Sequence, residues 1–164
     1  MPTAFRRAIM FFAAALATWA TAAVAQASTS GAHFMPDTTD SVNSSGALVV
    51  SIDEAGVGSQ TVTYTLSTDA TATYACINGG SNHPKAANKE NFSSHLTGGG
   101  SFSPINGRVV ASFSVGPLSA GGFTCPSGQS LVLASVSYSN VILTDTTNQV
   151  SITLPNRSAT FFTV

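Results

Sequence analysis

The chain contains 164 residues with a formal net charge of −1, and only 8% of them are charged. Typical globular domains carry about 25% charged residues, so serine and threonine supply most of the polarity here. Nucleic-acid binding rests on a basic patch, and a count of 6 Lys and Arg against 7 Asp and Glu provides none. The composition therefore argues against a nucleic-acid partner.

Residues 1–27 have the order of a secretory signal peptide. Two arginines precede a short apolar run, and small residues lead to a cleavage site after Ala27 or Ala25. An uncleaved anchor is the alternative, but the apolar run is shorter than the ~20 residues of a membrane-spanning helix. Cleavage leaves residues 28–164 as one domain whose net charge is 4 − 7 = −3, with no second long apolar run that could span a membrane. The predicted localisation is secreted, or extracellular.

Apolar and polar residues then alternate with a period of two, and no stretch keeps a helical period. The chain therefore predicts an all-β fold, a β-sandwich of immunoglobulin-like class with about 7–9 strands. The only tryptophan lies in the signal peptide, so the buried strand tryptophan of true immunoglobulin domains is missing. The predicted strands cover residues 32–36, 47–52, 60–67, 71–77, 92–96, 102–105, 108–115, 130–143, 150–154 and 159–164.

The turns between these strands follow from Gly, Asn, Asp and Pro. Residues 67–70 are expected to join two strands as a hairpin, and Asn106-Gly107 is the strongest short hairpin signal in the chain. Residues 37–46 and 53–58 are expected as polar turns. The alternation slips at Asn140, which predicts a bulge in that long strand.

Cys76 and Cys125 are the only cysteines, and in an exported chain they predict a disulfide. Alternation turns Cys76 inward beside Tyr74, while Cys125 lies in the Gly- and Pro-rich connection of residues 116–128. Closing a loop of about 50 residues should stabilise the fold by roughly 4 kcal/mol. Zinc would need four ligands that no C-x-x-C motif or histidine cluster supplies, so we expect neither a metal nor a cofactor.

No catalytic constellation is evident. Most carboxylates fall in predicted turns, where Asp side chains bind nearby backbone N–H groups, and the histidines are expected on the surface. No G-x-S-x-G elbow is present, and the Asp37-Thr-Thr-Asp40 segment lacks the acidic density of a calcium loop. The sequons at Asn43, Asn91 and Asn156 matter only in a host that glycosylates them.

Residues 78–100 form a long polar segment with one short strand, and such a loop is commonly functional. Its candidate binding residues, which offer donors to a glycan or a carboxylate-bearing polymer, are Asn78, Asn82, His83, Lys85, Asn88 and Lys89. Tyr64, Tyr74 and Phe113 are predicted to be buried. Phe92 and Tyr138 are then the candidates for stacking against sugar rings.

The motifs YACINGG at residues 74–80, PKAANK at residues 84–89 and CPSGQ at residues 125–129 are distinctive in combination. They resemble a group of small secreted bacterial proteins, mostly from actinobacteria, that have no assigned activity. The resemblance covers most of the chain after the signal peptide. It implies export, a disulfide between Cys76 and Cys125 and a β-sandwich, and it supplies no catalytic residues.

The expected function is that of a secreted, non-enzymatic module that binds a cell-surface or extracellular polymer, a polysaccharide or a cell-surface protein. A self-assembling, pilus-like subunit is the first alternative, although the C-terminus lacks the penultimate tyrosine of chaperone-assembled pilins. A small hydrolase or a protease inhibitor is a third class. No residue spacing supports a hydrolase, whereas residues 116–126 could form the exposed loop of an inhibitor.

Overall fold

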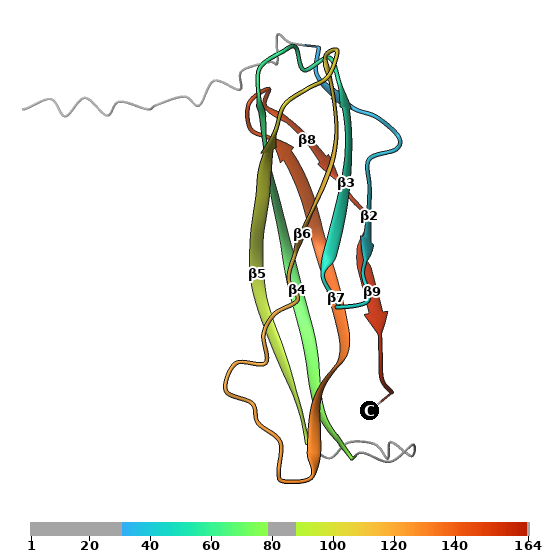
Figure 1. Cartoon of the computed structure of the whole chain (residues 1–164), viewed down its shortest axis with the longest axis vertical. Coiled ribbons are helices and arrows are strands. Elements are labelled where there is room, and N and C mark those ends of the chain that lie inside the picture. The colour runs from blue at the N-terminus through green and yellow to red at the C-terminus, as the bar shows by residue number, and fades with distance from the viewer. Residues whose placement is uncertain (1–30, 79–87, 164) are drawn as a thin grey trace, which may run out of the picture.

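The structure, a computed structural model, describes residues 31–78 and 88–163, and its strands confirm the all-β prediction (Figure 1). The predicted signal peptide lies outside these described residues. In chain order the strands are β1 His33–Phe34, β2 Thr39–Val42, β3 Leu48–Ala55, β4 Val62–Asn78, β5 Lys89–Phe102, β6 Arg108–Val115, β7 Gln129–Asp145, β8 Val150–Thr153 and β9 Arg157–Thr160. They form two antiparallel sheets that pack against each other around a common core.

The short sheet is built around β3. Strand β6 pairs with β3 over its full length, from Leu48 opposite Val115 to Ala55 opposite Arg108. Strands β1 and β2 pair with different parts of β3, at residues 54–55 and 48–51, and so share its other edge. The short sheet is therefore at most three strands wide.

The long sheet has the order β5–β4–β7, with β8 and β9 sharing the far edge of β7. Strands β4 and β7 have 17 residues each. At about 3.3 Å per residue they are roughly 55 Å long, which accounts for the elongated shape in Figure 1.

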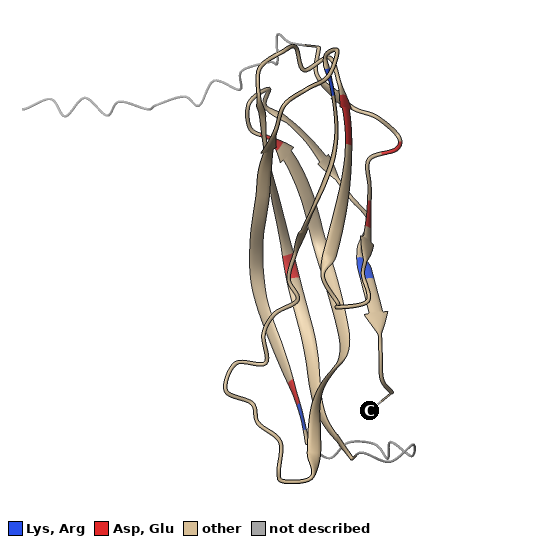
Figure 2. Ribbon diagram, viewed as in Figure 1, with Lys and Arg blue, Asp and Glu red and all other residues tan. Residues whose placement is uncertain are grey.

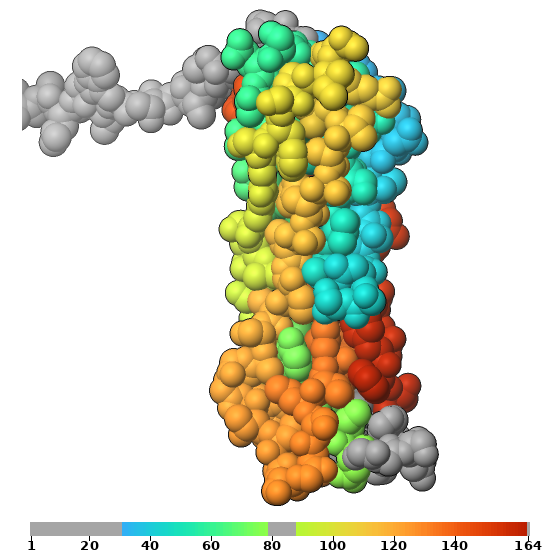
Figure 3. Space-filling view, in the orientation of Figure 1, coloured from blue at the N-terminus to red at the C-terminus, as the bar shows by residue number. Residues whose placement is uncertain are grey.

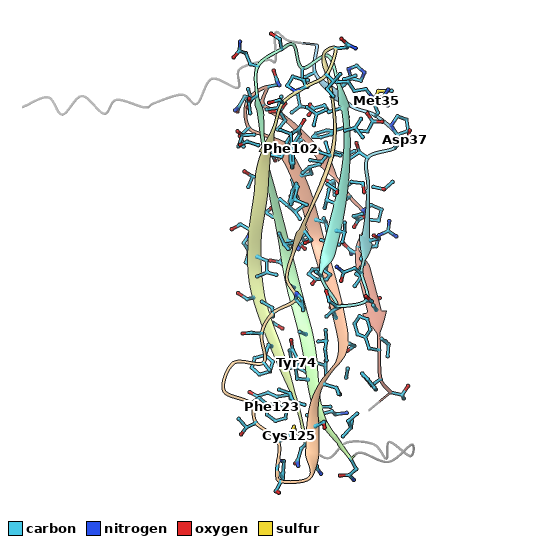
Figure 4. The ribbon with its side chains drawn as sticks, viewed as in Figure 1. Met35, Asp37, Tyr74, Phe102, Phe123 and Cys125 are labelled. Atoms are coloured by element: carbon cyan, nitrogen blue, oxygen red, sulfur yellow. A yellow bond between two sulfur atoms is a disulfide. The ribbon has the colours of Figure 1, made fainter. Side chains whose placement is uncertain are left out.

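The two layers are unequal in length, because β3 and β6 have only 8 residues each. Beyond the short sheet, residues 116–128 lie over the other end of the long sheet, where Figure 3 shows them in orange. The Tyr74 hydroxyl of β4 donates to the Leu118 carbonyl of this connection at 2.8 Å. Figure 4 shows Tyr74, Phe123 and Cys125 gathered at this end, far from Phe102 at the opposite one.

The core lies between the sheets and is built from alternate residues of their strands. Its fully buried side chains include Leu48, Val50, Ile52, Val62, Tyr64, Leu66, Val109, Tyr138, Val141 and Leu143. At one end Phe102 stands 6.0 Å from Tyr64 and 6.5 Å from Phe113, measured between ring centroids. The prediction that Tyr64 is buried is confirmed, whereas Phe113 and Tyr74 are half-buried.

The predicted hairpin at residues 67–70 is wrong, because β4 continues through this segment as one strand. Thr68 and Ala70 are buried and keep the phase of Leu66, so the side chains alternate without interruption. The irregularity lies instead in a shift of register with β7, between Ser67 and Asp69. There the Thr68 hydroxyl donates to the Ser139 carbonyl at 2.9 Å.

The prediction of a long loop over residues 78–100 is also wrong, since residues 89–102 form β5. This strand pairs residue by residue with β4, from Ala75 opposite Lys89 to Val62 opposite Phe102. Pairing with a neighbouring strand thus overrides the weak strand propensity of its glycines. The predicted turns at residues 37–46 and 53–58 likewise contain β2 and the end of β3.

The Asn106-Gly107 turn is confirmed, with φ angles of 52° and 75°. It does not form the hairpin that we expected, because β6 pairs with β3, and residues before the turn contribute only the Ile105–Arg108 bridge. The turn carries the chain from the long sheet to the short one. The bulge expected at Asn140 is confirmed by its φ of 52° and by the register shift beside it.

Candidate functional site

The predicted disulfide between Cys76 and Cys125 is present, with 5.5 Å between the Cα atoms. Cys76 lies near the end of β4 and is buried, while Cys125 lies in the connection of residues 116–128. The bond joins that connection to the long sheet at the level where the short sheet no longer covers it. Its position indicates a structural role.

The predicted binding loop can be placed only at its two ends. Asn78 is the exposed last residue of β4, and Lys89 is the exposed first residue of β5. Asn88 is exposed, and its carbonyl accepts a hydrogen bond from the Cys76 N–H at 3.0 Å. The other candidates of the loop, Asn82, His83 and Lys85, lie outside the described residues.

The two predicted stacking residues do not form an exposed aromatic platform. Tyr138 is 1% exposed, and its hydroxyl donates to the Gly46 carbonyl at 2.6 Å, so it belongs to the core. Phe92 is half-buried and stands edge-on to Tyr74, with 5.9 Å between ring centroids. The prediction for Tyr138 is wrong because its side chain faces the core on the same side of β7 as Val136. The bulge at Asn140 interrupts the alternation of the strand, so this orientation is hard to recognise in the sequence.

A different surface stands out, the outer side of the long sheet. We call it the hydroxyl face, because most of the residues that face away from the core there are serine or threonine. It consists of Thr63, Thr65, Ser67, Thr71 and Thr73 of β4, Ser93, Thr97 and Ser101 of β5, Ser135, Ser137, Ser139 and Thr144 of β7, Ser151 and Thr153 of β8, and Ser158 and Thr160 of β9. Figure 2 shows how few charged residues interrupt the strands.

Hydroxyl groups on neighbouring strands bind one another across this face. The hydroxyls of Thr63 and Ser101 are 2.9 Å apart, as are those of Thr71 and Ser93. Along each strand the outward residues recur about every 6.7 Å, and neighbouring strands are about 4.8 Å apart. The face is thus a regular two-dimensional array of groups that both donate and accept hydrogen bonds.

A charged cluster lies in the middle of the hydroxyl face, where β5, β4 and the bulge of β7 meet. His95 Nδ1 is 2.8 Å from Asp69 Oδ1, and Asn140 Nδ2 donates to Asp69 Oδ2 at 2.7 Å. The hydrogen bond from Asn140, followed by that from His95, lowers the pKa of Asp69 and favours its charged form. Within the described part of the chain, Nε2 of the exposed His95 has no hydrogen-bond partner.

The sequence did not predict this cluster, because Asp69 was expected in a hairpin turn and His95 in a short strand within the long polar segment. The signal that could have found the face was present in the Thr-x-Thr and Ser-x-Ser alternation of residues 61–65, 71–73 and 135–139. Only the strand pairing brings these segments side by side.

The outer side of the short sheet has a shallow hollow of about 540 Å³ that includes Asp37, Asp53, Arg108 and Val110 in its lining. Arg108 Nε donates to Asp53 Oδ1 at 2.6 Å, and Nη2 donates to Oδ2. This hydrogen bonding with Arg108 lowers the pKa of Asp53. Because the guanidinium is already held by a carboxylate, the hollow has little charge left for a ligand.

A buried acidic group lies inside the sandwich, near the end that holds Phe102. Glu54 of β3 and Asp145 of β7 are both fully buried. Desolvation raises the pKa of Glu54 to about 7, and the charge of Asp145 contributes to the increase. Asp145 accepts hydrogen bonds from the backbone N–H groups of Thr147 and Asn148, whereas both carboxyl oxygens of Glu54 lack a partner among the described residues.

Within residues 31–78 and 88–163, two segments of the chain, no three His, Cys, Asp or Glu side chains gather closely enough to hold a metal ion. No helix in them is long and apolar enough to cross a membrane.

Comparisons with protein-family models, curated proteins and solved structures gave no match for this chain. The resemblance to small secreted actinobacterial proteins therefore stays a prediction.

Proposed function

We propose that this chain is a secreted, non-enzymatic β-sandwich protein that binds a neutral extracellular polysaccharide through the hydroxyl face. The observation that carries the proposal is the array of serine and threonine side chains across β5, β4, β7, β8 and β9. The immunoglobulin-like class of the sandwich is part of the same proposal, and its two antiparallel sheets support it.

The chemistry of the face favours a neutral ligand that is rich in hydroxyl groups. Each serine or threonine hydroxyl donates one hydrogen bond and accepts others, which suits the hydroxyls of a sugar. Strands β4 and β7 contain no lysine or arginine, and β5 contains only Lys89 at its first position. An anionic polymer therefore finds no lysine or arginine counter-charge in the middle of the face. The regular spacing of the array suits a repeating polymer better than a single small molecule.

The face lacks the apolar centre that a protein partner would need. Protein interfaces are enriched in aromatic residues, methionine and arginine at their core. Here Ile142, 40% exposed, is the one large apolar side chain on the hydroxyl face, and the nearby aromatic residues point inward or are half-buried. Hydrogen bonds with a glycan are the interactions that this surface offers.

The central cluster supports a binding role over a catalytic one. A serine nucleophile needs its hydroxyl within hydrogen-bond reach of the base. Among the described residues no hydroxyl binds the ring of His95, whose one ring contact is with Asp69. On this proposal His95 and Asp69 are the polar centre of the binding face.

Export is supported by two features of different kinds. The first 27 residues have the composition of a signal peptide, and the disulfide is of a kind that persists in oxidising compartments. A polysaccharide outside the cell is then accessible to the protein.

The test is co-sedimentation of the oxidised chain with insoluble neutral polysaccharides, compared with a T65V/T73V/S137A variant. The substitutions remove three outward hydroxyls from β4 and β7 and preserve most of the side-chain volume. At about 1 kcal/mol for each lost hydrogen bond, binding should weaken on the order of 100-fold.

The matched control is S51A/S112A/S114A, which removes three exposed hydroxyls from the outer side of the short sheet. It should sediment with the polymer as the unmodified chain does. Equal retention of both triple variants would refute the role of the hydroxyl face, and so would the absence of retention on any neutral polymer.

A further inference from the structure

Strand β5 is the exposed edge of the long sheet. Its 14 residues pair with β4 on one side, and no described strand pairs with its other side. None of its residues is buried, unlike those of the other long strands β4 and β7. Figure 1 shows β5 along the side of the molecule with no strand beyond it.

This edge lacks the features that usually prevent one strand edge from pairing with another. Proteins protect edges with proline, bulges or charged residues, above all lysine. Strand β5 contains no proline, keeps an unbroken register with β4, and has charged residues only at Lys89 and Glu90. Among the described strands, none occupies the outer edge of the segment from Asn91 to Phe102, which can therefore accept another strand.

The sequence of β5 is also self-complementary in size. Its first part contains the large residues Lys89, Glu90, Asn91 and Phe92, whereas residues 98–100 are glycines. Antiparallel pairing of two copies, centred on His95, places Phe92 of each copy opposite Gly98 of the other. Val115 of β6 already covers the inner side of Gly98, so this register avoids a clash between large residues and fills no empty space.

The same register avoids repulsion between the charged residues at the start of the strand. Lys89 stands opposite Ser101 of the second copy, and Glu90 stands opposite Gly100. Opposite residues then lie on the same side of the sheet, so the two hydroxyl faces join into one.

We propose that two copies of this chain associate through their β5 strands, antiparallel and related by a two-fold axis at His95, so that two long sheets form one continuous sheet. A closed two-fold dimer satisfies both free edges at once. The inference rests on the edge of β5 and stands apart from polysaccharide binding. The dimer would nevertheless double the hydroxyl face available to a polymer.

The test uses charges placed by register and is run without polysaccharide. In this register Ser93 of each copy stands opposite Thr97 of the other copy. The S93K/T97K variant therefore sets lysine against lysine at both positions, whereas S93K/T97E sets lysine against glutamate. Sedimentation equilibrium should give the unmodified chain twice the mass of one copy, and S93K/T97K should dissociate on the order of tenfold more readily than S93K/T97E.

Circular dichroism of both variants checks that they keep the fold, and S93K/T97E carries the same number of substitutions as its partner. A monomeric unmodified chain at every concentration would overturn the proposal. Equal dimerisation of the two double variants would overturn it as well, because a β5 interface in this register places like charges opposite each other in S93K/T97K and opposite charges in S93K/T97E.

Discussion

The buried carboxyl of Glu54 makes the stability of this protein depend on pH in an unusual direction. Glu54 lies in β3 opposite Val109, is 0% exposed, and has two oxygens without hydrogen-bond partners among the described residues. Burial raises its pKa from 4.5 to about 7. The folded protein therefore keeps a proton that the unfolded chain has already released.

The sign and size of the effect follow from this difference. Between about pH 4.5 and pH 7 the folded state binds more protons than the unfolded state, so the free energy of unfolding falls as the pH rises. The rise of the Glu54 pKa from 4.5 to about 7 corresponds to roughly 3 kcal/mol of stability that is present at low pH and lost at high pH. Most carboxylates in proteins act in the opposite direction.

The perturbation is Glu54→Gln, which keeps the shape of the side chain and removes the titration. Urea unfolding at about pH 5 and about pH 8 should show the unmodified chain losing roughly 3 kcal/mol over this interval, and E54Q losing much less. The control is E90Q, because Glu90 is exposed on β5 and should leave the pH dependence unchanged. A parallel pH dependence in E54Q and the unmodified chain would refute the assignment to Glu54.

Two other predictions concern the packing of the long sheet. Replacing Cys76 and Cys125 by serine should lower the free energy of unfolding by roughly 4 kcal/mol, because the bond closes a loop of 49 residues; a change below ~1 kcal/mol in urea titrations would contradict this. Tyr138→Phe removes the hydrogen bond to the buried Gly46 carbonyl and should cost about 1–3 kcal/mol, whereas Tyr74→Phe, at the less buried Leu118 contact, should cost less. A larger loss of stability in Tyr74→Phe than in Tyr138→Phe, measured by thermal unfolding, would show that burial does not determine the loss.

The alternation of residue types was sufficient to predict the all-β class and most strand positions. It succeeded where one side of a strand is buried, as in β6, whose Val109 and Val115 face the core. It also predicted the bulge at Asn140, because the phase of the buried residues changes there. These features depend on neighbours along the chain.

Features that depend on pairing between distant segments were missed. Residues 67–70 look like a turn because of Asp69, yet β7 and β5 hold them in a strand on both sides. The glycines of residues 98–100 suggested a loop, although β4 provides the partner that makes them a strand. Glu54 was expected in a turn because of the polar and glycine residues around it, and an unpaired carboxyl is costly to bury, so nothing local indicated its burial.

The candidate site was missed for the same reason. Its hydroxyl residues were visible as an abundance of Ser and Thr, but the face exists only after five strands pair in register. The predicted stacking residue Tyr138 and the predicted loop residues came from local composition. Such composition does not say which way a side chain faces once a bulge has shifted the strand.

Polysaccharide binding by the hydroxyl face is tested most directly by mapping the backbone amide resonances of the oxidised chain while a soluble fragment of a neutral polysaccharide is added. We expect shifts concentrated in β4, β5 and β7, around Asp69, His95 and Ser137, with β3 and β6 unaffected. Shifts confined to the short sheet, or to the ends of residues 78–89, would place the binding surface elsewhere and contradict the central claim.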